Sequence, residues 1–503
     1  MSKKSRGRLN YIFVKISEIM KKSLLYLSIF AIIACFTFTA CDDDNDPKIT
    51  EPPVEESIFP KKELRGVWVA TVYGLDWPQG KYTEAAQKQF YKDYLDKFVE
   101  TNINAVFVQI RGKADAFYDS PYEPWTVELT GTANGDPGYD VLQFLIDETH
   151  ARGLEFHAWL NPYRIATRSA ATASFPALDS RIDPTWVKDY ATIRLYNPAL
   201  PDVQDRIIDI VSDVVTKYDV DGIHIDDYFY PYPEYYTNGL EDAAEFATYG
   251  GEYTRIEDFR RGNVDKVVQR MYNAIVQIRP SAVFSVAPAG DIDYNFNTLY
   301  ADVIKWYDNQ WADMFIPQIY SATGNPTTTT TFNSRLSVWS QYYKTKAALI
   351  VGHALYKFGD GTSSGFQTTK ELTEQFRLIN KVNGVQGSVL YDARAFFANR
   401  INIIDVLKEE VYKNPAVRPF VGRKTLPDPT PATGISQSGT TLTWTAAAGL
   451  SSVVYVIPTD ETKAKVAAIL TTNTFTMTER GKYFISTVNR NNVESEVSAP
   501  IIY

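Results

Sequence analysis

Two consecutive aspartates, Asp226 and Asp227, are the clearest candidates for acid–base chemistry in this sequence. They close the segment 221–228, which reads Asp-Gly-Ile-His-Ile-Asp-Asp-Tyr. Successive side chains of a strand point to opposite faces, so the two isoleucines share one face, and His224, Asp226 and Tyr228 share the other. An inward carboxylate is costly to bury unless it is paired or used. We therefore predict a functional carboxylate at Asp226.

Cleavage of a glycosidic bond is one chemistry that uses two carboxyl groups in different protonation states. Asp226 is predicted to hold the ionised role, with Arg111 or Arg164 lowering its pKa and His224 available to hydrogen-bond it. Glu123, two residues before Trp125, is the first candidate for the protonated role, because an apolar wall would disfavour its ionised form. The alternatives for that role are Asp227, Asp115, Asp291 and Asp293.

Further polar and aromatic residues follow other short apolar runs, where strands are expected to end. Carboxylates, amides and flat rings together suit a neutral, polyhydroxylated ligand. The predicted substrate-binding residues are Gln109, Arg111, Asp115, His157, Trp159, Asn161, Arg164, His224, Tyr228, Gln318, Tyr320 and Lys357.

The elements that must position these residues alternate in type along the chain. Eight short apolar runs are separated by stretches with helical periodicity, which predicts a (β/α)₈ TIM barrel, an α/β fold. An open doubly wound sheet is the alternative, but no glycine-rich phosphate loop follows the first run. The predicted strands are 66–72, 104–110, 155–160, 222–228, 283–288, 313–320, 348–353 and 387–391.

The remaining segments define the predicted domain organisation. Residues 1–41 resemble a signal peptide with a lipobox that would place lipid on Cys41, and a plain signal peptide cut near residue 40 is the alternative. An acidic, proline-rich tether (42–61), the barrel (62–412) and a proline-rich linker (413–432) follow. Residues 433–503 have the period of two expected for a small all-β sandwich, with Lys463–Leu470 as its one possible helix.

Composition limits the partners of the chain. The net charge is −9, so a polyphosphate backbone would be repelled and nucleic acid is not expected. The two cysteines, Cys35 and Cys41, both fall in the amino-terminal segment, so we expect neither a disulfide nor a cysteine metal site in the folded part. No cofactor is expected. The predicted location is the envelope of a Gram-negative cell, anchored through Cys41 in the outer membrane and facing the periplasm or the cell surface.

Several ordered motifs resemble those of the family-10 glycosyl-hydrolase-like proteins, which are distinct from the family-10 xylanases. The resemblance implies a TIM barrel, a glycosidase whose relatives cut peptide-free glycan strands of peptidoglycan, and a catalytic role for the Asp226-Asp227 pair. Relatives commonly carry Arg-Pro-x-Gly-Asp at residues 111–115, where this chain has Arg-Gly-Lys-Ala-Asp. The carboxy-terminal module resembles a fibronectin type III module. The barrel motifs are 63–68, 75–78, 108–111, 115–118, 123–125, 161–164, 221–228 and 317–320.

The sequence is also compatible with two other functions. A metal-dependent hydrolase could use His157, His224, His353 and Asp226 as ligands, although no His-x-His spacing is present. A glycan-binding lipoprotein without catalytic activity would keep the same groove.

Overall fold

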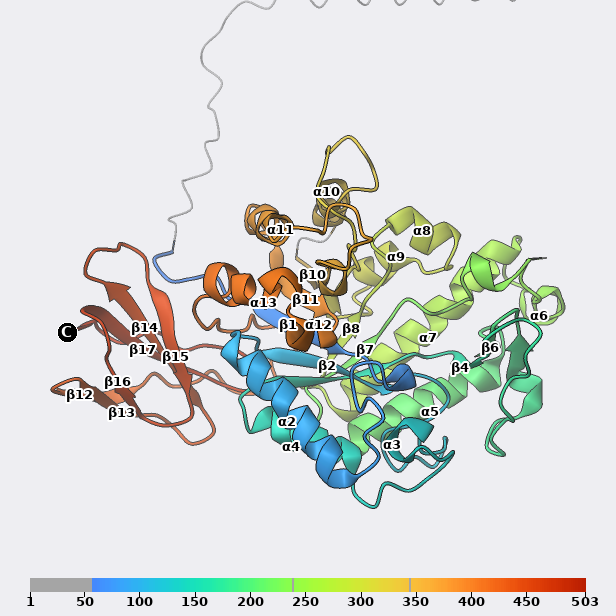
Figure 1. Cartoon of the computed structure of the whole chain (residues 1–503), viewed down its shortest axis with the longest axis horizontal. Helices are drawn as coiled ribbons and strands as arrows, with labels where there is room; N and C mark the ends of the chain where they lie inside the picture. Colours follow the sequence, from blue (N-terminus) through green and yellow to red (C-terminus); the bar gives the residue numbers. More distant parts are fainter. Residues whose placement is uncertain (1–56, 238, 343–344) are drawn as a thin grey trace, which may run out of the picture. The chain divides into compact units, whose positions relative to one another are not determined.

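Eight parallel strands form a closed barrel at the centre of the computed structural model, which describes residues 57–237, 239–342 and 345–503 (Figure 1). The order around the barrel is β1-β11-β10-β9-β8-β7-β3-β2. All eight predicted strands are present, and the predicted TIM barrel is confirmed. The strands are β1 (Leu64–Val69), β2 (Ala105–Arg111), β3 (Glu155–Leu160), β7 (Gly222–Ile225), β8 (Val283–Val286), β9 (Met314–Phe315), β10 (Ala348–Ala354) and β11 (Val385–Tyr391).

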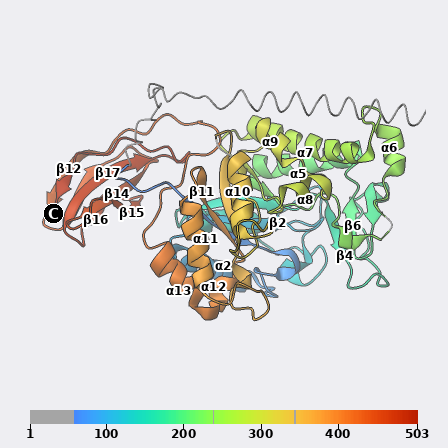
Figure 2. The same ribbon diagram turned by 90° about the horizontal axis from the view of Figure 1, so that it is seen from above.

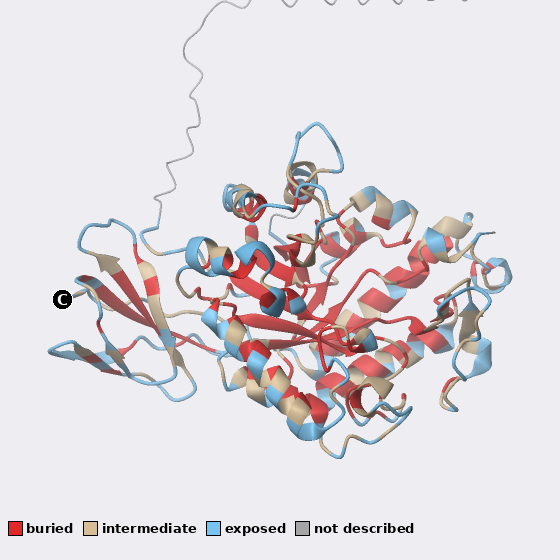
Figure 3. Ribbon diagram, viewed as in Figure 1, coloured by how far each residue is buried: buried red, intermediate tan, exposed pale blue. Residues whose placement is uncertain are grey.

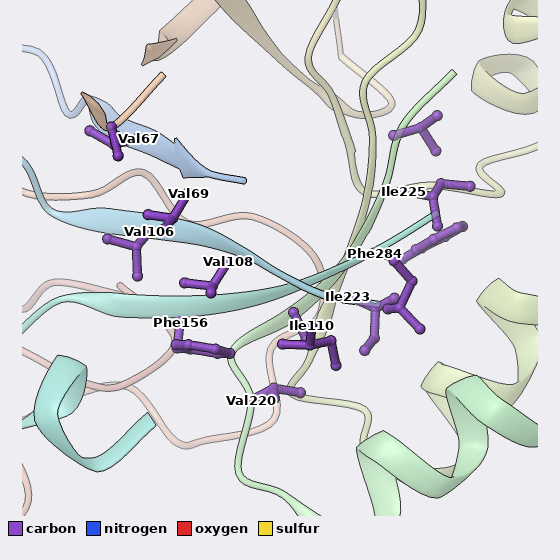
Figure 4. Close-up of a cluster of buried hydrophobic side chains, with 14 of the residues drawn as sticks. Val67, Val69, Val106, Val108, Ile110, Phe156, Val220, Ile223, Ile225 and Phe284 are labelled. Atoms are coloured by element: carbon purple, nitrogen blue, oxygen red, sulfur yellow. The ribbon is translucent and has the colours of Figure 1, made fainter. Parts of the chain in front are cut away.

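Both faces of these strands are buried, which is why they are apolar runs and not alternating ones (Figure 3). One set of side chains packs outward against the helices; Figure 4 shows Val106, Val108 and Ile223 among them. The other set fills the barrel interior, where Trp68, Phe107 and other large side chains leave a packed core and no pore.

Helices surround the barrel in both ribbon views (Figures 1 and 2). The buried residues Val203, Ile207 and Val214 of α5 recur at the helical period, and Pro201 begins the helix, where no backbone N–H is needed. Residues 400–411 form a series of short helical pieces. The α-helices are α2 (Glu84–Glu100), α3 (Val127–Thr130), α4 (Val141–His150), α5 (Pro201–Lys217), α6 (Ala243–Tyr249), α7 (Ile256–Ile278), α8 (Ile292–Asn297), α9 (Val303–Asp308), α10 (Phe332–Tyr342), α11 (Lys370–Asn380), α12 (Arg394–Ala398) and α13 (Ile403–Val406).

A small antiparallel sheet lies in the long connection between β3 and α5. Its strands are β4 (Arg164–Thr167), β5 (Val187–Asp189) and β6 (Ile193–Tyr196), with β6 in the middle. The sequence pattern does not predict this sheet. It begins at Arg164, so it helps to fix the first residues that follow β3.

The carboxy-terminal region is all β, as predicted. One sheet holds three strands in the order β12-β13-β16, and the other holds four in the order β15-β14-β17-β18. Its assignment as a fibronectin type III module stays a prediction. The strands are β12 (Thr433–Ser438), β13 (Thr441–Thr445), β14 (Ser451–Pro458), β15 (Lys465–Leu470), β16 (Thr474–Thr476), β17 (Gly481–Val488) and β18 (Ile501–Ile502).

The helix suggested at Lys463–Leu470 is wrong, because residues 465–470 form β15. Its alanines, lysines and leucine favour a helix locally. Antiparallel pairing with β14, in which Val466 lies opposite Tyr455, instead satisfies the backbone and buries Val466. Tertiary pairing overrides the local preference.

The linker and the carboxy-terminal module contact the amino-terminal end of the barrel. Arg418 forms an ion pair with Glu155 at the start of β3 (3.0 Å), and Asn492 donates to the same carboxylate (2.7 Å). Arg490 pairs with Asp219, just before β7, at 2.6 Å. These contacts engage the end of the barrel opposite the carboxyl ends of its strands.

The predicted signal peptide, Cys41 and most of the tether lie outside the described residues. Among the helices of residues 57–237, 239–342 and 345–503, none has both the length and the apolarity needed to cross a bilayer.

Gly222 tests how tightly the interior is packed. A β-carbon at this position would lie 2.3 Å from His157 Nδ1 and 2.8 Å from the Val283 carbonyl oxygen. Because the carbonyl belongs to the neighbouring strand, we expect Gly222→Ala to lower the free energy of unfolding by about 1–3 kcal/mol. The measurement is chemical denaturation followed by tryptophan fluorescence.

Gly251→Ala is the matched control, since a β-carbon there would meet nothing within 4 Å. We expect its stability to change by less than about 1 kcal/mol. Equal stability of the two variants would show that the interior at Gly222 has room to relax.

Candidate active site

Asp226 follows β7 at the carboxyl end of the barrel, and its carboxylate is held by neighbouring donors. Trp159 Nε1 donates to Oδ2 at 3.0 Å, and Asn161 Nδ2 donates to the same oxygen at 3.4 Å. The backbone N–H of Tyr228 donates to Oδ1 at 3.4 Å. Trp159 and Asn161 come from the strand next to β7, so the barrel register determines this contact.

The surroundings of Asp226 favour its protonated form. Burial raises the pKa of its carboxyl group to about 7, and the negative charge of Asp227 adds to the rise. The positive charge of Arg164 and the Trp159 N–H act in the opposite direction but are outweighed. Arg164 therefore lowers the Asp226 pKa as predicted, yet the group does not stay reliably ionised near neutral pH. The predicted role for Asp226 does not fit this environment.

Asp227 lines a cavity of about 350 Å³ at the same end of the barrel. Tyr232 donates its hydroxyl proton to Asp227 Oδ2, and the Gln318 side chain also hydrogen-bonds the carboxylate. Burial raises the Asp227 pKa, and these two donors oppose the rise. The other residues around the cavity are Ala289, Gly290, Asp291, Tyr294, Tyr320 and Arg335.

His224 lies two residues before Asp226, in the barrel interior and farther from the carboxyl end, and it does not hydrogen-bond Asp226. Trp68 Nε1 donates to His224 Nε2 at 2.9 Å, and His224 Nδ1 lies 2.8 Å from Ser285 Oγ. Burial lowers the His224 pKa, so the ring is neutral. Its ring lies edge-on to Trp159 at 6.2 Å. The structure therefore places His224 under the site, where it supports Trp159 and does not reach the cavity.

Arg111 and Glu123, both predicted to act on substrate or on Asp226, instead bind each other. Arg111 Nε donates to Glu123 Oε2 at 2.7 Å, and each side chain is only 1% exposed. Another Arg111 N–H donates to the carbonyl oxygen of Asn161. Glu123 is thus committed to an ion pair behind Asn161 and is not brought to Asp226, because a buried guanidinium needs a carboxylate partner.

Arg164 joins the loop after β3 to the site. Its Nε donates to the Gly112 carbonyl at 2.7 Å, and its guanidinium lies over the Tyr228 ring, 4.9 Å from the centroid. Its backbone N–H donates to Asn161 Oδ1 at 3.0 Å, which orients the Asn161 amide toward Asp226. Arg164, Asn161 and Tyr228 are therefore brought together as predicted.

His157 is placed too deep to bind substrate. It stacks on Phe107 with ring centroids 4.4 Å apart, and its Nε2 lies 3.3 Å from Glu155 Oε2 near the amino-terminal end of the barrel. The inward orientation was predicted correctly. Its depth in the barrel was not predicted correctly. His157 lies two residues before Trp159 on the same face of β3, so its side chain is one layer farther from the carboxyl end of the barrel.

Gln109 and Asp115 also have structural partners. Gln109 Oε1 accepts from the backbone N–H of Val72 at 3.0 Å, while its Nε2 is buried with no partner among the described residues. Asp115 pairs with Lys113 at 3.4 Å. Both residues shape the loops around the mouth.

Tyr320, which lines the Asp227 cavity, forms an aromatic surface with two neighbours. Its ring stacks against Tyr391 (5.9 Å, 17°) and meets Tyr356 edge-on at 6.2 Å. Lys357 Nζ donates to the Tyr320 carbonyl at 2.8 Å, so it holds this loop in place. Flat rings of this kind can stack on the apolar faces of sugars.

Three residues near the carboxylates are not marked by the sequence pattern: Tyr232, Tyr294 and Arg335. They lie in loops or on the first turns of helices, where no periodicity marks a side chain as inward. Of the alternative acids, Asp291 accepts from the Tyr294 N–H as the cap of α8, and Asp293 is exposed on that helix.

The ligand set of the metal alternative is not brought together. His353 faces the helices, where its Nδ1 lies 2.7 Å from Gln375 Oε1 and its Nε2 lies 3.1 Å from Ser388 Oγ. His353 therefore does not face the other residues of this proposed ligand set. No cluster of three or more His, Cys, Asp or Glu side chains suited to a metal occurs within the described part of the chain.

Comparison with known proteins gives one family. Residues 63–367 match the model of the family described as glycosyl hydrolase-like 10. The chain is 35% identical over 380 residues to glycosyl hydrolase YngK of Bacillus subtilis (strain 168), covering 71% of this chain and 73% of that protein. It is 30% identical over 387 residues to glycosyl hydrolase DigH of Escherichia coli (strain K12), covering 69% and 86%.

The Arg111–Glu123 pair yields a stability prediction. In Glu123→Gln the buried Arg111 charge loses its counter-ion, so we expect the free energy of unfolding to fall by about 3 kcal/mol. Glu128→Gln is the control, since Glu128 lies 3.3 Å from Lys113 in a partly exposed pair that Asp115 can replace. That change should cost less than about 1 kcal/mol. Similar denaturation midpoints for the two variants would contradict the role assigned to Glu123.

Proposed function

Because the chain belongs to the glycosyl hydrolase-like 10 family and is a glycoside hydrolase, we propose that it cleaves the glycan strands of peptidoglycan, or a related amino-sugar glycan, with Asp226 and Asp227 as its two carboxyl groups. The observation that carries the proposal is the pair itself. Asp226 is held by Trp159 and Asn161 at the carboxyl end of the barrel, and Asp227 beside it lines a cavity with Gln318 and Tyr320.

The chemistry of the cavity supports a glycan as substrate. Arg335, whose buried Nε has no partner among the described residues, supplies an N–H donor for a sugar oxygen, and the rings of Tyr294 and Tyr320 offer flat surfaces. Catalytic groups of TIM barrels lie at the carboxyl ends of the strands, which is where Asp226 and Asp227 follow β7. The described contacts of the carboxy-terminal module are at the opposite end of the barrel, so they do not cover the aspartates.

The two carboxyl groups are proposed to hold different protonation states. Asp226, with a pKa near 7, keeps a proton in slightly acidic solution and donates it to the glycosidic oxygen as the bond breaks. Asp227, hydrogen-bonded by Tyr232 and Gln318, supplies the negative charge that the developing oxocarbenium ion needs. These roles reverse the predicted order, in which Asp226 was ionised and Glu123 was the acid.

We also propose that the enzyme is a lipoprotein of the Gram-negative envelope, attached through Cys41. The support is the sequence pattern at residues 38–41, Phe-Thr-Ala-Cys, which follows an apolar run. An anchored enzyme of this kind would meet its polymeric substrate in the envelope.

Substitution of either aspartate tests the pair. Asparagine keeps the shape of the side chain but can neither donate a proton as an acid nor carry charge, so we expect kcat to fall by about 10²–10⁴-fold in Asp226→Asn and in Asp227→Asn. The measurement is digestion of purified, peptide-free glycan strands with the products identified by mass spectrometry.

Asp293→Asn is the matched control, because Asp293 is exposed on α8, and its kcat should match the wild type. Full activity in Asp226→Asn would remove the proposed acid. If the wild-type protein binds these strands and a panel of other polysaccharides but cuts none, the protein is a glycan-binding one.

The pH dependence tests the assigned roles. An acid that must be protonated works below its pKa, so kcat/KM should fall as pH rises through about 7. Trp159→Phe removes an N–H that lowers the Asp226 pKa, and the alkaline limb should therefore move to higher pH.

Trp444→Phe provides the comparison, since this indole donates to Ser452 Oγ within the carboxy-terminal module (2.8 Å) and does not contact Asp226. Its alkaline limb should match that of the wild type. An alkaline limb that stays in place or moves to lower pH in Trp159→Phe would argue against Asp226 as the proton donor.

A further inference from the structure

A second cavity, of about 380 Å³, opens near the carboxyl ends of β10 and β11. None of the predicted site residues lines it. Its wall combines aromatic rings with charged side chains, a mixture that suits a sugar carrying a charged substituent. The residues that matter for its chemistry are Tyr356, Phe358, Asp360, Asp392, Arg394 and Arg400.

An aromatic surface joins this cavity to the one at Asp227. Tyr356 lines the second cavity, and its ring centroid lies 5.7 Å from that of Tyr391 and 6.2 Å from that of Tyr320. Tyr320 in turn lines the cavity of Asp227. The two cavities are therefore the ends of one run of rings along which a short stretch of glycan can lie.

Most charges in the second cavity are already balanced. Arg394 pairs with Asp392 at 2.7 Å and with Asp76 at 3.2 Å. Asp360 accepts hydrogen bonds from Thr362, Ser363 and Gln367 within its own loop. The charged groups of Asp360, Asp392 and Arg394 therefore already have partners and do not need an ionic ligand.

Arg400 is the exception. Its side chain is exposed at the rim of the cavity, its NH1 donates to the carbonyl oxygen of Tyr356 at 3.3 Å, and it forms no ion pair with any residue that the structure describes. A guanidinium has five N–H donors and keeps its charge at all relevant pH values. Arg400 thus presents unused donors and an uncompensated positive charge at this cavity.

The backbone that carries Arg400 adopts a rare conformation. Its neighbours Asn399, Ile401 and Asn402 have φ values of 37°, 51° and 61°, and for a β-branched residue such as Ile401 this left-handed region is a clear outlier. Gly359, with φ 64°, allows close approach, since a β-carbon there would lie 3.1 Å from Arg400 Cβ. Strained backbone of this kind clusters at ligand-binding sites.

We propose that the second cavity is a subsite for a carboxylate-bearing sugar residue of the glycan, and that Arg400 is the group that binds the carboxylate. Planar guanidinium groups bind carboxylates through two parallel N–H···O bonds, which makes arginine suited to this recognition. The inference rests on the proposed function and extends it, because it identifies the kind of sugar that lies beyond the cleaved bond.

The test compares two forms of one polymer. Peptide-free peptidoglycan strands carry a carboxylate on the lactyl group of each muramic acid residue, and chemical reduction converts these carboxylates to alcohols. We expect the wild type to prefer the carboxylate form, and Arg400→Gln to lower kcat/KM for that form by about tenfold, mainly through KM. The ratio of kcat/KM between the two forms should then fall to near one.

Arg377→Gln is the matched control. It removes one exposed arginine charge from α11, where Arg377 pairs with Glu374, and the preference ratio should stay at the wild-type value. If Arg400→Gln lowers kcat/KM equally for both polymers, or leaves the ratio of kcat/KM between them unchanged, Arg400 does not bind the carboxylate and the proposal is overturned.

A binding experiment separates this inference from the proposed catalytic mechanism. Calorimetric titration of the Asp226→Asn protein with uncleaved strands measures the subsite without hydrolysis. Tighter binding of the carboxylate form, lost in the Asp226→Asn, Arg400→Gln double variant, would support the subsite even if the wild type cut neither polymer. Equal binding of the two forms would overturn it.

Discussion

The removal of the Asp226 carboxyl group from water is the constraint on which the site depends. A buried carboxyl group needs donors, and here they come from Trp159 and Asn161 on the adjacent strand. Trp159 in turn packs on His224, which Trp68 and Ser285 hold from β1 and β8. Contacts across four strands thus fix the orientation of one side chain.

A second set of contacts holds Asn161, one of the two side chains that donate to Asp226. Arg111, held by Glu123, donates to the carbonyl oxygen of Asn161, and the backbone N–H of Arg164 donates to the Asn161 side chain. The loop after β3 is therefore held from two directions. A buried ion pair contributes little net stability compared with apolar packing, because both charges lose their hydration. Its value here is positional: it keeps the Asn161 amide aimed at Asp226.

The two ends of the barrel have separate tasks. At the amino-terminal end, Glu155 and Asp219 form ion pairs with Arg418 and Arg490, and these attach the linker and the carboxy-terminal module. At the carboxyl end, loops carry the aspartates, the tyrosines and both cavities. Substitutions in these loops can therefore change the ligand while the packed interior and the attached module stay in place.

The sequence alone determined the barrel, because eight apolar runs separated by helical periodicities allow few other arrangements, and it placed Asp226 inward by the two-residue repeat. It could not show that Arg111 takes Glu123 away from catalysis, that His157 lies one level too deep, or that residues 465–470 pair as a strand. Those outcomes depend on which side chains meet across strands far apart in the chain. The pKa of Asp226 was decided in the same way, since burial by the surrounding fold outweighs the nearby arginine.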